Sequence, residues 1–277
     1  MLSIDSLKRF FSAQNPESKQ AGKPEKKQAA EMTAAEEAWD ILKTILLAVA
    51  ITLVFRMVAW QPFNIPSGSM RPNLLVGDFL VVSKFEYGYS KASLVYPLTR
   101  LPLEGRLLGS NPERGDVVVF KNTRDGNKDY IKRVVGLPGD EIRVVQGTVY
   151  INNEPIPRQL VSTDTIACSG IRSQAATFRE TLPNGVSYLI QECYGNNFKW
   201  DNYGPRTVPD GHFFMMGDNR DNSQDSRTPT VDFVPADQIV GKAQRLVFSV
   251  DGSESRIWQI WNWPSAIRYS RVFDPVE

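Results

Sequence analysis

Ser69 is the first side chain whose setting could support chemistry. It follows a glycine in the run Ile65-Pro-Ser-Gly-Ser-Met70, where an extended chain can turn sharply and leave a hydroxyl exposed. A serine hydroxyl becomes a nucleophile when a neighbouring base takes its proton. Taken alone, a Ser-Gly-Ser sequence is more often a solvated loop, so the assignment of Ser69 depends on a base elsewhere in the chain.

Lys132 is the candidate base. It lies in Asp129-Tyr-Ile-Lys-Arg-Val-Val135, a strand pattern that places Lys132 on the same face as Tyr130 and Val134, and Arg133 on the opposite face. Burial penalises the charged form of an amine and lowers its pKa, which turns an inert cation into a usable general base. A surface lysine on an edge strand is the alternative.

A third segment is polar throughout. Gly217-Asp-Asn-Arg-Asp-Asn-Ser-Gln-Asp-Ser-Arg227 carries no apolar side chain and comes directly after the apolar run Phe213-Phe-Met-Met216. A loop of this kind at the end of a core strand is either solvated or forms a polar network beside a site.

Together, the three segments resemble the type I signal peptidases, membrane-bound serine proteases with a Ser/Lys dyad. The motifs P-S-G-S-M, G-D-x-x-x-V, Y-I-K-R-V-V-G-L-P-G-D and G-D-N-R-D-N-S-x-D-S-R occur in this order. The similarity extends from about Gln61 to Val247 and recurs in Trp263-Pro-Ser-Ala-Ile-Arg-Tyr-Ser-Arg271. This combination behind an apolar segment is highly specific.

The resemblance implies a role for each residue of the site. Ser69 would be the nucleophile and Lys132 the general base, with the hydroxyl of Ser223 orienting the lysine. The backbone N–H of Ser69 and the hydroxyl of Ser67 would form the oxyanion hole, a large contribution to acyl transfer in comparable sites. The resemblance implies no cofactor and no metal.

Two further sets of residues follow from the resemblance. The supporting ion pairs would be Asp218 with Arg133 and Asp225 with Arg227, although surface charge is the alternative for both. A substrate groove for small side chains, of the Ala-x-Ala kind before a cleavage site, would be lined by Phe63, Ile65, Met70, Leu74, Tyr130, Ile131 and Met216.

Composition excludes several other classes of protein. The chain of 277 residues has 32 basic and 31 acidic side chains and a net charge of +1, which gives no support to nucleic-acid binding. Its one histidine, His212, lies where the resemblance has no use for it, so a Ser-His-Asp triad is not expected. One histidine and two cysteines are too few for a structural zinc site.

An apolar segment near the N-terminus predicts one membrane span. In Ile41–Trp60 all but four of the twenty positions are apolar, and a helix of that length crosses a bilayer core of roughly 30 Å. The alternatives are a buried core helix and a cleaved signal peptide, the latter disfavoured by the forty residues that precede the segment. The basic residues lie mainly upstream of the span, which favours a cytoplasmic tail and an exported body.

The rest of the chain predicts a mainly β protein: an antiparallel β-sheet catalytic core with an inserted smaller β and loop domain. Strands are expected at 79–82, 117–120, 130–135, 142–145, 149–151, 188–191, 213–216 and 246–250. The expected segments are a flexible cytoplasmic tail (1–37), a transmembrane helix (38–60), the first part of the core (61–152), a loop-rich insertion (153–211), the second part of the core (212–250) and a membrane-proximal aromatic segment (251–277).

Two features stay open at this stage. Cys168 and Cys193 either form a disulfide in an oxidising compartment or remain free thiols. The aromatic run from Arg256 to Arg271 suits a membrane headgroup zone, but it could equally close the β core.

The resulting hypothesis is a bacterial endopeptidase, anchored in the inner membrane with a periplasmic catalytic domain, whose partners are exported preprotein signal peptides and the phospholipid membrane. A self-cleaving repressor of the related Ser/Lys fold is the nearest alternative, although no helix-turn-helix pattern precedes the β body. A membrane-tethered β scaffold without enzymatic activity is the other.

Overall fold

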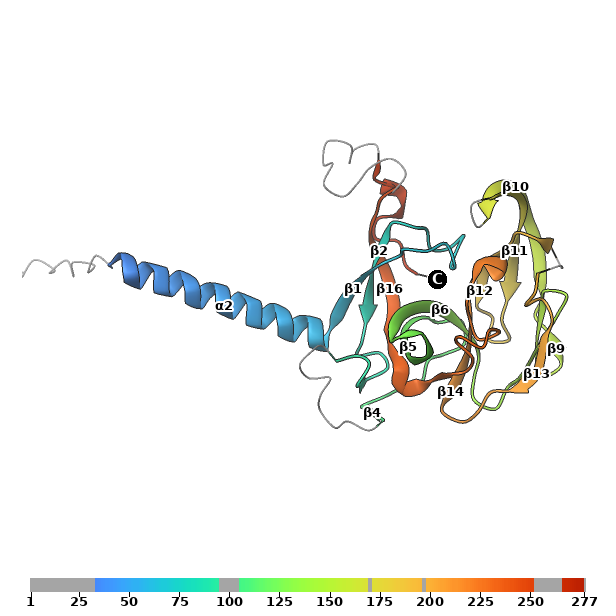
Figure 1. The fold of residues 1–277 in the computed structure, drawn as a ribbon, viewed down its shortest axis with the longest axis horizontal. Coiled ribbons are helices and arrows are strands. Elements are labelled where there is room, and N and C mark those ends of the chain that lie inside the picture. Colours follow the sequence, from blue (N-terminus) through green and yellow to red (C-terminus); the bar gives the residue numbers. More distant parts are fainter. Residues whose placement is uncertain (1–32, 95–104, 169–170, 196–197, 252–265, 277) are drawn as a thin grey trace, which may run out of the picture. The chain divides into compact units, whose positions relative to one another are not determined.

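The structure is a computed structural model that describes residues 33–94, 105–168, 171–195, 198–251 and 266–276. Residues 1–32 of the tail expected at 1–37 and most of the aromatic segment, including Trp258, Trp261 and Trp263, lie outside these residues. Residues 49–277 form one compact unit that contains all of the described strands (Figure 1).

The N-terminal helix α2 spans Ala34–Val58. It begins with a capping box, because the Thr33 N–H and hydroxyl donate to the Glu36 carboxylate at 2.8 and 3.0 Å while the Glu36 N–H donates to the Thr33 hydroxyl at 3.4 Å. Its stretch Ala34–Phe55 is long and apolar enough to cross a membrane, and none of it is buried in the protein. The helix thus begins four residues before the expected start and ends before Trp60, which belongs to the first strand.

A seven-stranded antiparallel sheet forms the centre of residues 49–277. Its strands, in spatial order, are β1 (Trp60–Asn64), β2 (Asp78–Ser83), β16 (Ile239–Ser249), β5 (Val117–Asn122), β6 (Lys128–Gly136), β14 (His212–Met216) and β15 (Val234–Pro235). Strands β6 and β14 pair although they lie far apart in the sequence, so the polar loop after β14 lies at the end of a strand that pairs with β6.

Three smaller sheets complete the described part. One contains β10 (Arg158–Cys168), β11 (Ile171–Thr181) and β12 (Ser187–Glu192); another contains β13 (Tyr203–Thr207), β7 (Glu141–Val145), β8 (Thr148–Ile151) and β9 (Glu154–Pro155); the third pairs β3 (Tyr89–Ser90) with β4 (Arg106–Leu107). Short 3-10 helices occur at η2 (Thr123–Asp125), η4 (Arg220–Asn222), η5 (Ala236–Gln238) and η7 (Tyr269–Arg271). The mainly β, antiparallel prediction is confirmed.

The segment 153–211 differs from the expected loop-rich insertion. Strands β10 and β11, of eleven residues each, pair antiparallel there, and β12 joins them in a sheet of their own (Figure 1). Strand β13, which also falls in the segment, pairs instead with β7 of the preceding part. The boundary expected after residue 152 falls between β8 and β9, two strands that pair with each other. The six-segment division of the chain stays a prediction.

Apolar side chains from the large sheet, from the β10–β12 sheet (the inserted sheet) and from the sheet of β13, β7, β8 and β9 pack into a shared core. One buried cluster joins Val135 of β6, Ile142 of β7, Ile190 of β12 and Phe214 of β14. Each such fully buried side chain stabilises the fold by about 1.5–3 kcal/mol. The inserted strands are therefore fixed to β6, which contains Lys132, and to β14, which leads into the polar loop 217–227.

A disulfide joins Cys168 to Cys193, with 6.0 Å between the Cα atoms and a sequence separation of 25. In the chain-entropy model a bridge over a loop of this length stabilises the fold by roughly 3.5 kcal/mol. We expect a Cys168→Ala/Cys193→Ala variant to unfold roughly 7–14 °C below the unsubstituted protein in a thermal scan in detergent. A reducing agent should lower the melting temperature of the unsubstituted protein only. Equal melting temperatures for the two proteins in the absence of reducing agent would contradict the prediction.

Candidate active site

The structure brings Ser69 and Lys132 into direct contact. Lys132 Nζ donates to Ser69 Oγ at 2.9 Å and to the carbonyl oxygen of its neighbour Ile131 at 2.6 Å. Lys132 is 3% exposed and Ser69 8%. Burial lowers the pKa of Lys132 from 10.5 to about 8, while the charges of Asp225 and Asp218 oppose the shift. Contact, burial and lowered pKa are the properties that a general base needs.

The polar loop after β14 holds the main chain around Ser69. The Asn219 N–H donates to the Ser69 carbonyl at 3.1 Å, and the Asn219 side chain donates to the Gly68 carbonyl at 3.0 Å. Gly217 lies against the same carbonyl and against the side chain of Ser223. The loop is therefore packed against the Ser69 segment and is not a solvated surface loop.

Two predicted ion pairs lie within this packed region. Arg133 donates through Nε and one terminal nitrogen to both oxygens of Asp218, at 2.9 and 2.8 Å. Arg227 likewise donates to both oxygens of Asp225, at 2.9 Å each. All four side chains are at most 1% exposed, so these pairs are not the surface charges of the alternative reading. Two-point hydrogen bonding offsets the cost of removing such charges from water.

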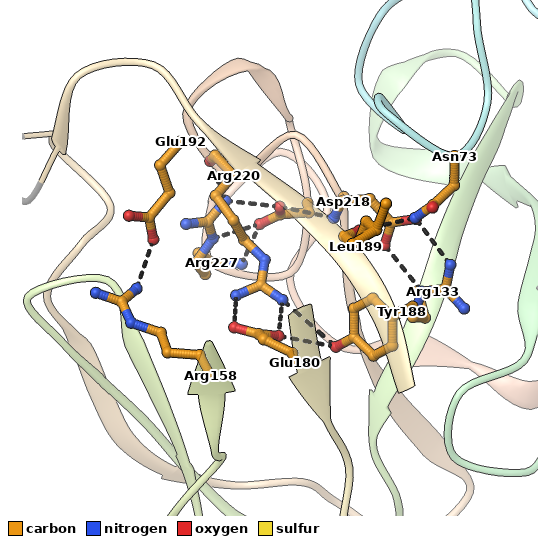
Figure 2. A network of polar contacts seen from close by, with 12 residues as sticks. Asn73, Arg133, Arg158, Glu180, Tyr188, Leu189, Glu192, Asp218, Arg220 and Arg227 are labelled. Atoms are coloured by element: carbon orange, nitrogen blue, oxygen red, sulfur yellow. Dashed lines mark hydrogen bonds and ion pairs between the residues drawn. The ribbon is translucent and has the colours of Figure 1, made fainter. Parts of the chain in front are cut away.

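Other partners of the loop come from the inserted sheet and were missed from the sequence. Arg220 donates to both oxygens of Glu180 on β11, and the Tyr188 hydroxyl on β12 also donates to Glu180, at 3.0 Å (Figure 2). The Arg133 guanidinium lies 4.1 Å from the centre of the Tyr188 ring. Tyr188 thus contacts two of these three buried arginine pairs, the Arg133 pair through its ring and the Arg220 pair through its hydroxyl.

Asn73 was missed as well. Its side-chain amide donates to Asp218 and to the Leu189 carbonyl, at 2.7 Å each, and so connects the segment after Ser69 to β12 (Figure 2). No periodicity marks such a contact, because its partners are 116 and 145 residues away in the chain. The one available signal was the concentration of charge in 217–227, which requires counter-charges somewhere else in the fold.

The two remaining hydroxyls of the predicted site differ in their contacts. Ser67 Oγ donates to Ser69 Oγ at 3.4 Å, a long hydrogen bond, and Ser67 is exposed. Ser223 Oγ is buried and makes no hydrogen bond to any described residue. The expected contact from Ser223 to Lys132 is therefore not formed here, and the Ile131 carbonyl takes its place as the second acceptor of the amine.

One cavity is lined by Ser69 and Lys132, and a second shares lining residues with it. A cavity of about 260 Å³ is lined by Ser67, Ser69, Lys132, Asn222 and their neighbours, and a second of about 170 Å³ shares Pro66, Asp129, Tyr130 and Ile131 with the first. Of the predicted groove residues, Phe63, Ile65, Tyr130 and Ile131 line these cavities. Met70 and Leu74 lie in one core cluster and Met216 in another, because their strand and turn positions turn them inward.

His212 contacts residues other than those around Ser69. Its ring nitrogen Nδ1 lies 2.9 Å from the Asp210 carbonyl oxygen, and its main chain pairs with Pro235 of β15. Within the described residues no three His, Cys, Asp or Glu side chains gather in a way that could hold a metal ion.

Comparison with known proteins gives a consistent result. The family model described as signal peptidase, peptidase S26, matches residues 38–248. Signal peptidase I of Rickettsia typhi is 39% identical over 239 residues, 81% of this chain and 89% of the relative, and that of Rickettsia conorii is 36% identical over 253 residues, 86% and 92%. A crystal structure of a signal peptidase I from Enterococcus faecalis is 25% identical and covers 48% of this chain and 97% of its own, with a TM-score of 0.28.

The family model and the two Rickettsia relatives define the class of enzyme as a serine peptidase. More narrowly, the chain belongs to the signal peptidase family, whose members cleave signal peptides, and its N-terminal apolar helix fits a membrane anchor. The family is an enzyme family, so the repressor and the non-enzymatic scaffold considered from the sequence are both set aside.

Gly217 tests how closely the polar loop must approach Ser69. A Cβ at this position would overlap the Ser223 side chain and lie 2.6 Å from the Ser69 carbonyl oxygen. We expect Gly217→Ala to cost about 1–3 kcal/mol of stability and to lower cleavage at least about ten-fold, because the Ser69 segment has to move. Gly211→Ala is the control: its φ of +69° strains an alanine, but nothing lies within 4 Å of the new Cβ, so activity should persist. Full activity of Gly217→Ala would contradict this packing.

Asp218→Asn tests the buried ion pair. The substitution leaves Arg133 charged and 0% exposed without its counter-charge, so we expect a loss of about 3–5 kcal/mol in the free energy of unfolding. Lys121→Gln removes a pair whose side chains are 34% and 40% exposed, and should cost less than about 1 kcal/mol. Denaturant titration in detergent measures both, and similar losses for the two variants would refute the distinction.

Proposed function

We propose that this chain is a membrane-anchored serine endopeptidase that removes signal peptides from exported preproteins with a Ser69/Lys132 dyad. The observation that carries the proposal is the 2.9 Å contact between Lys132 Nζ and Ser69 Oγ in a site where both residues are buried. In this mechanism Lys132 takes the Ser69 proton as the serine oxygen attacks the scissile carbonyl, and returns it to the leaving amine.

The lowered pKa of Lys132 removes most of the energetic handicap of a lysine base. At a pKa of 10.5 less than about 0.1% of the amine is neutral at pH 7, which adds more than about 4 kcal/mol to the barrier. At the pKa of about 8 that burial produces, about 10% is neutral, and the handicap falls to about 1.4 kcal/mol. The remaining cost is one that ordinary enzymatic barriers can absorb.

Ser67 and Ser223 take supporting roles in the proposal. The Ser67 hydroxyl, 3.4 Å from the attacking oxygen, and the Ser69 N–H would donate to the developing oxyanion. Ser223 Oγ, which is buried and makes no hydrogen bond to a described residue, would rotate to orient the amine once substrate excludes the remaining water.

The cavities favour small side chains in the substrate. Volumes of about 260 and 170 Å³ beside the nucleophile suit alanine-sized residues of an extended peptide. Phe63, Ile65, Tyr130 and Ile131 supply the walls, and the shared lining residues make the two cavities one continuous groove.

The proposed location follows from the helix and its flanking charges. The apolar stretch Ala34–Phe55 would anchor the chain in the bacterial inner membrane, with the basic residues upstream of it in the cytoplasm and residues 61–277 on the periplasmic side. Its partners would then be preprotein signal peptides and phospholipid, and the net charge of +1 gives no reason to add nucleic acid.

The pH dependence of cleavage tests the dyad. Lys132 must be neutral to accept the proton, so kcat/KM should rise with pH through an apparent pKa near 8 and level off above it. Lys132→Ala and Lys132→Arg should both lose at least about 1,000-fold in activity and stay folded. Alanine has no group that could accept the proton, and the guanidinium of arginine remains protonated at working pH. Incubation of the detergent-solubilised chain with a preprotein, followed by sequencing of the new N-terminus, measures the activity.

Two further variants complete this experiment. Ser69→Ala should be inactive, and His212→Ala should cleave as well as the unsubstituted enzyme, since its ring contacts the Asp210 carbonyl and not Ser69. Substantial turnover by Lys132→Arg, or loss of activity in His212→Ala, would refute the Ser/Lys assignment.

A further inference from the structure

The Cys168–Cys193 disulfide closes one end of the inserted three-stranded sheet. Cys168 is the last residue of β10, and Cys193 directly follows β12, so the bond connects the two outer strands across β11. The two side chains are 1% and 2% exposed and pack with Ala175 of β11. The bond therefore fixes the main chain at the point where it leaves β12.

The main chain at that point binds a carboxylate of the polar loop 217–227, here called the catalytic loop. The N–H groups of Cys193 and Tyr194 donate to the same oxygen, Oδ2, of Asp221, at 2.6 and 2.7 Å. Asp221 is 3% exposed, and its other oxygen makes no hydrogen bond to a described residue. Burial raises the pKa of Asp221, and the two N–H groups oppose that shift. One carboxylate oxygen thus carries this connection between the disulfide and the loop.

Asp221 occupies the middle of the 3-10 helix η4, between the residues that contact Ser69 and the residues that line its cavity. On one side, Asn219 donates to the carbonyls of Ser69 and Gly68. On the other, Asn222 lines the cavity around Ser69 and Lys132. A shift of Asp221 therefore moves both the support of Ser69 and the wall that covers Lys132.

We propose that Cys168, Cys193 and Asp221 form a positioning unit for the active site, in which the disulfide fixes the Cys193–Tyr194 main chain and that main chain fixes the catalytic loop through Asp221. None of the three residues takes part in a chemical step. The inference rests on the proposed Ser69/Lys132 dyad, whose geometry the unit maintains.

Loss of the unit has a particular expected effect. When η4 moves, water reaches Lys132 and its pKa rises from about 8 toward the ordinary 10.5. At a fixed pH near neutrality, kcat then falls because less of the amine is neutral and the Ser69 oxygen is less well placed. KM should change less than kcat, since Phe63, Ile65 and Ile131 of the groove lie on other elements, although Asn222 of the loop lines the cavity around Ser69.

The experiment compares four variants of the full chain in detergent: Cys168→Ala/Cys193→Ala, Asp221→Ala, the combined triple variant, and Asp221→Asn. Mass spectrometry first verifies the disulfide in the unsubstituted protein, and near-UV circular dichroism selects a temperature at which every variant is folded. Leu182→Ala is the matched control, because it destabilises the same sheet at the turn between β11 and β12, the opposite end of β12 from Cys193.

We expect the cysteine variant and Asp221→Ala each to lower kcat about ten-fold and to move the pH profile of kcat upward by about half a unit or more. The triple variant should match either one, since both changes break one connection. Asp221→Asn keeps an oxygen for the two N–H groups and should recover most of the activity. Leu182→Ala should lower the melting temperature and leave kcat and the pH profile unchanged.

Three results would overturn the inference: an unchanged kcat and pH profile in the folded cysteine variant, independent and additive effects of the cysteine and Asp221 changes, or the same loss in Leu182→Ala. Failure of the proposed dyad is recognised separately, by cleavage in Lys132→Ala. If Lys132→Ala is inactive while the cysteine variant keeps its profile, the dyad stands and only the positioning unit is refuted.

Discussion

The burial of one amine beside one hydroxyl is the constraint on which the rest of the structure depends. Lys132 is held out of water, and the resulting desolvation, not a neighbouring cation, lowers its pKa. Asp225 and Asp218 act against that effect. Were either carboxylate unpaired, its full charge would favour the ammonium form of Lys132 in a region of low dielectric. Arg227 and Arg133 therefore do more than stabilise the loop. They neutralise these carboxylates and so limit the rise in the pKa of Lys132.

The same arrangement explains why Asp218 and Asp225, the two carboxylates whose charges act on Lys132, are so fully hydrogen-bonded. A buried charge without a partner costs several kcal/mol, so each added arginine requires a carboxylate, and each carboxylate requires its remaining lone pairs to be used. Asp218 meets this requirement with Arg133 and Asn73, and Asp225 with Arg227 and the Gly217 N–H. Such a network is rigid, since movement of any member leaves another unsatisfied. Rigidity of this kind is useful where a base must stay within hydrogen-bond distance of its nucleophile.

The sequence could predict the centre of this arrangement but not its periphery. Alternation along β6 correctly placed Lys132 and Arg133 on opposite faces, and both faces proved to be buried, because one core cluster packs against Val134 and another against Val135. Four of the seven groove residues line the cavities, while Met70, Leu74 and Met216 are core, since an apolar side chain near a site satisfies either role equally well. The partners of the loop, such as Glu180, lie on strands whose place in the fold no local pattern specifies.

The property that concealed β10 and β11 in the sequence is connected with what the inserted sheet does. A strand is recognised by alternating apolar residues, and β11, Ile171–Thr181, instead places Glu180 in a fully buried position. By hydrophobicity that residue argues against a core strand. Its burial is intelligible only with the bidentate contact to Arg220, which belongs to the polar loop after β14, forty residues later. The inserted sheet must therefore present polar groups to the loop where an ordinary sheet would present apolar ones, so a weak strand signal is the physical consequence of a sheet that packs against charges.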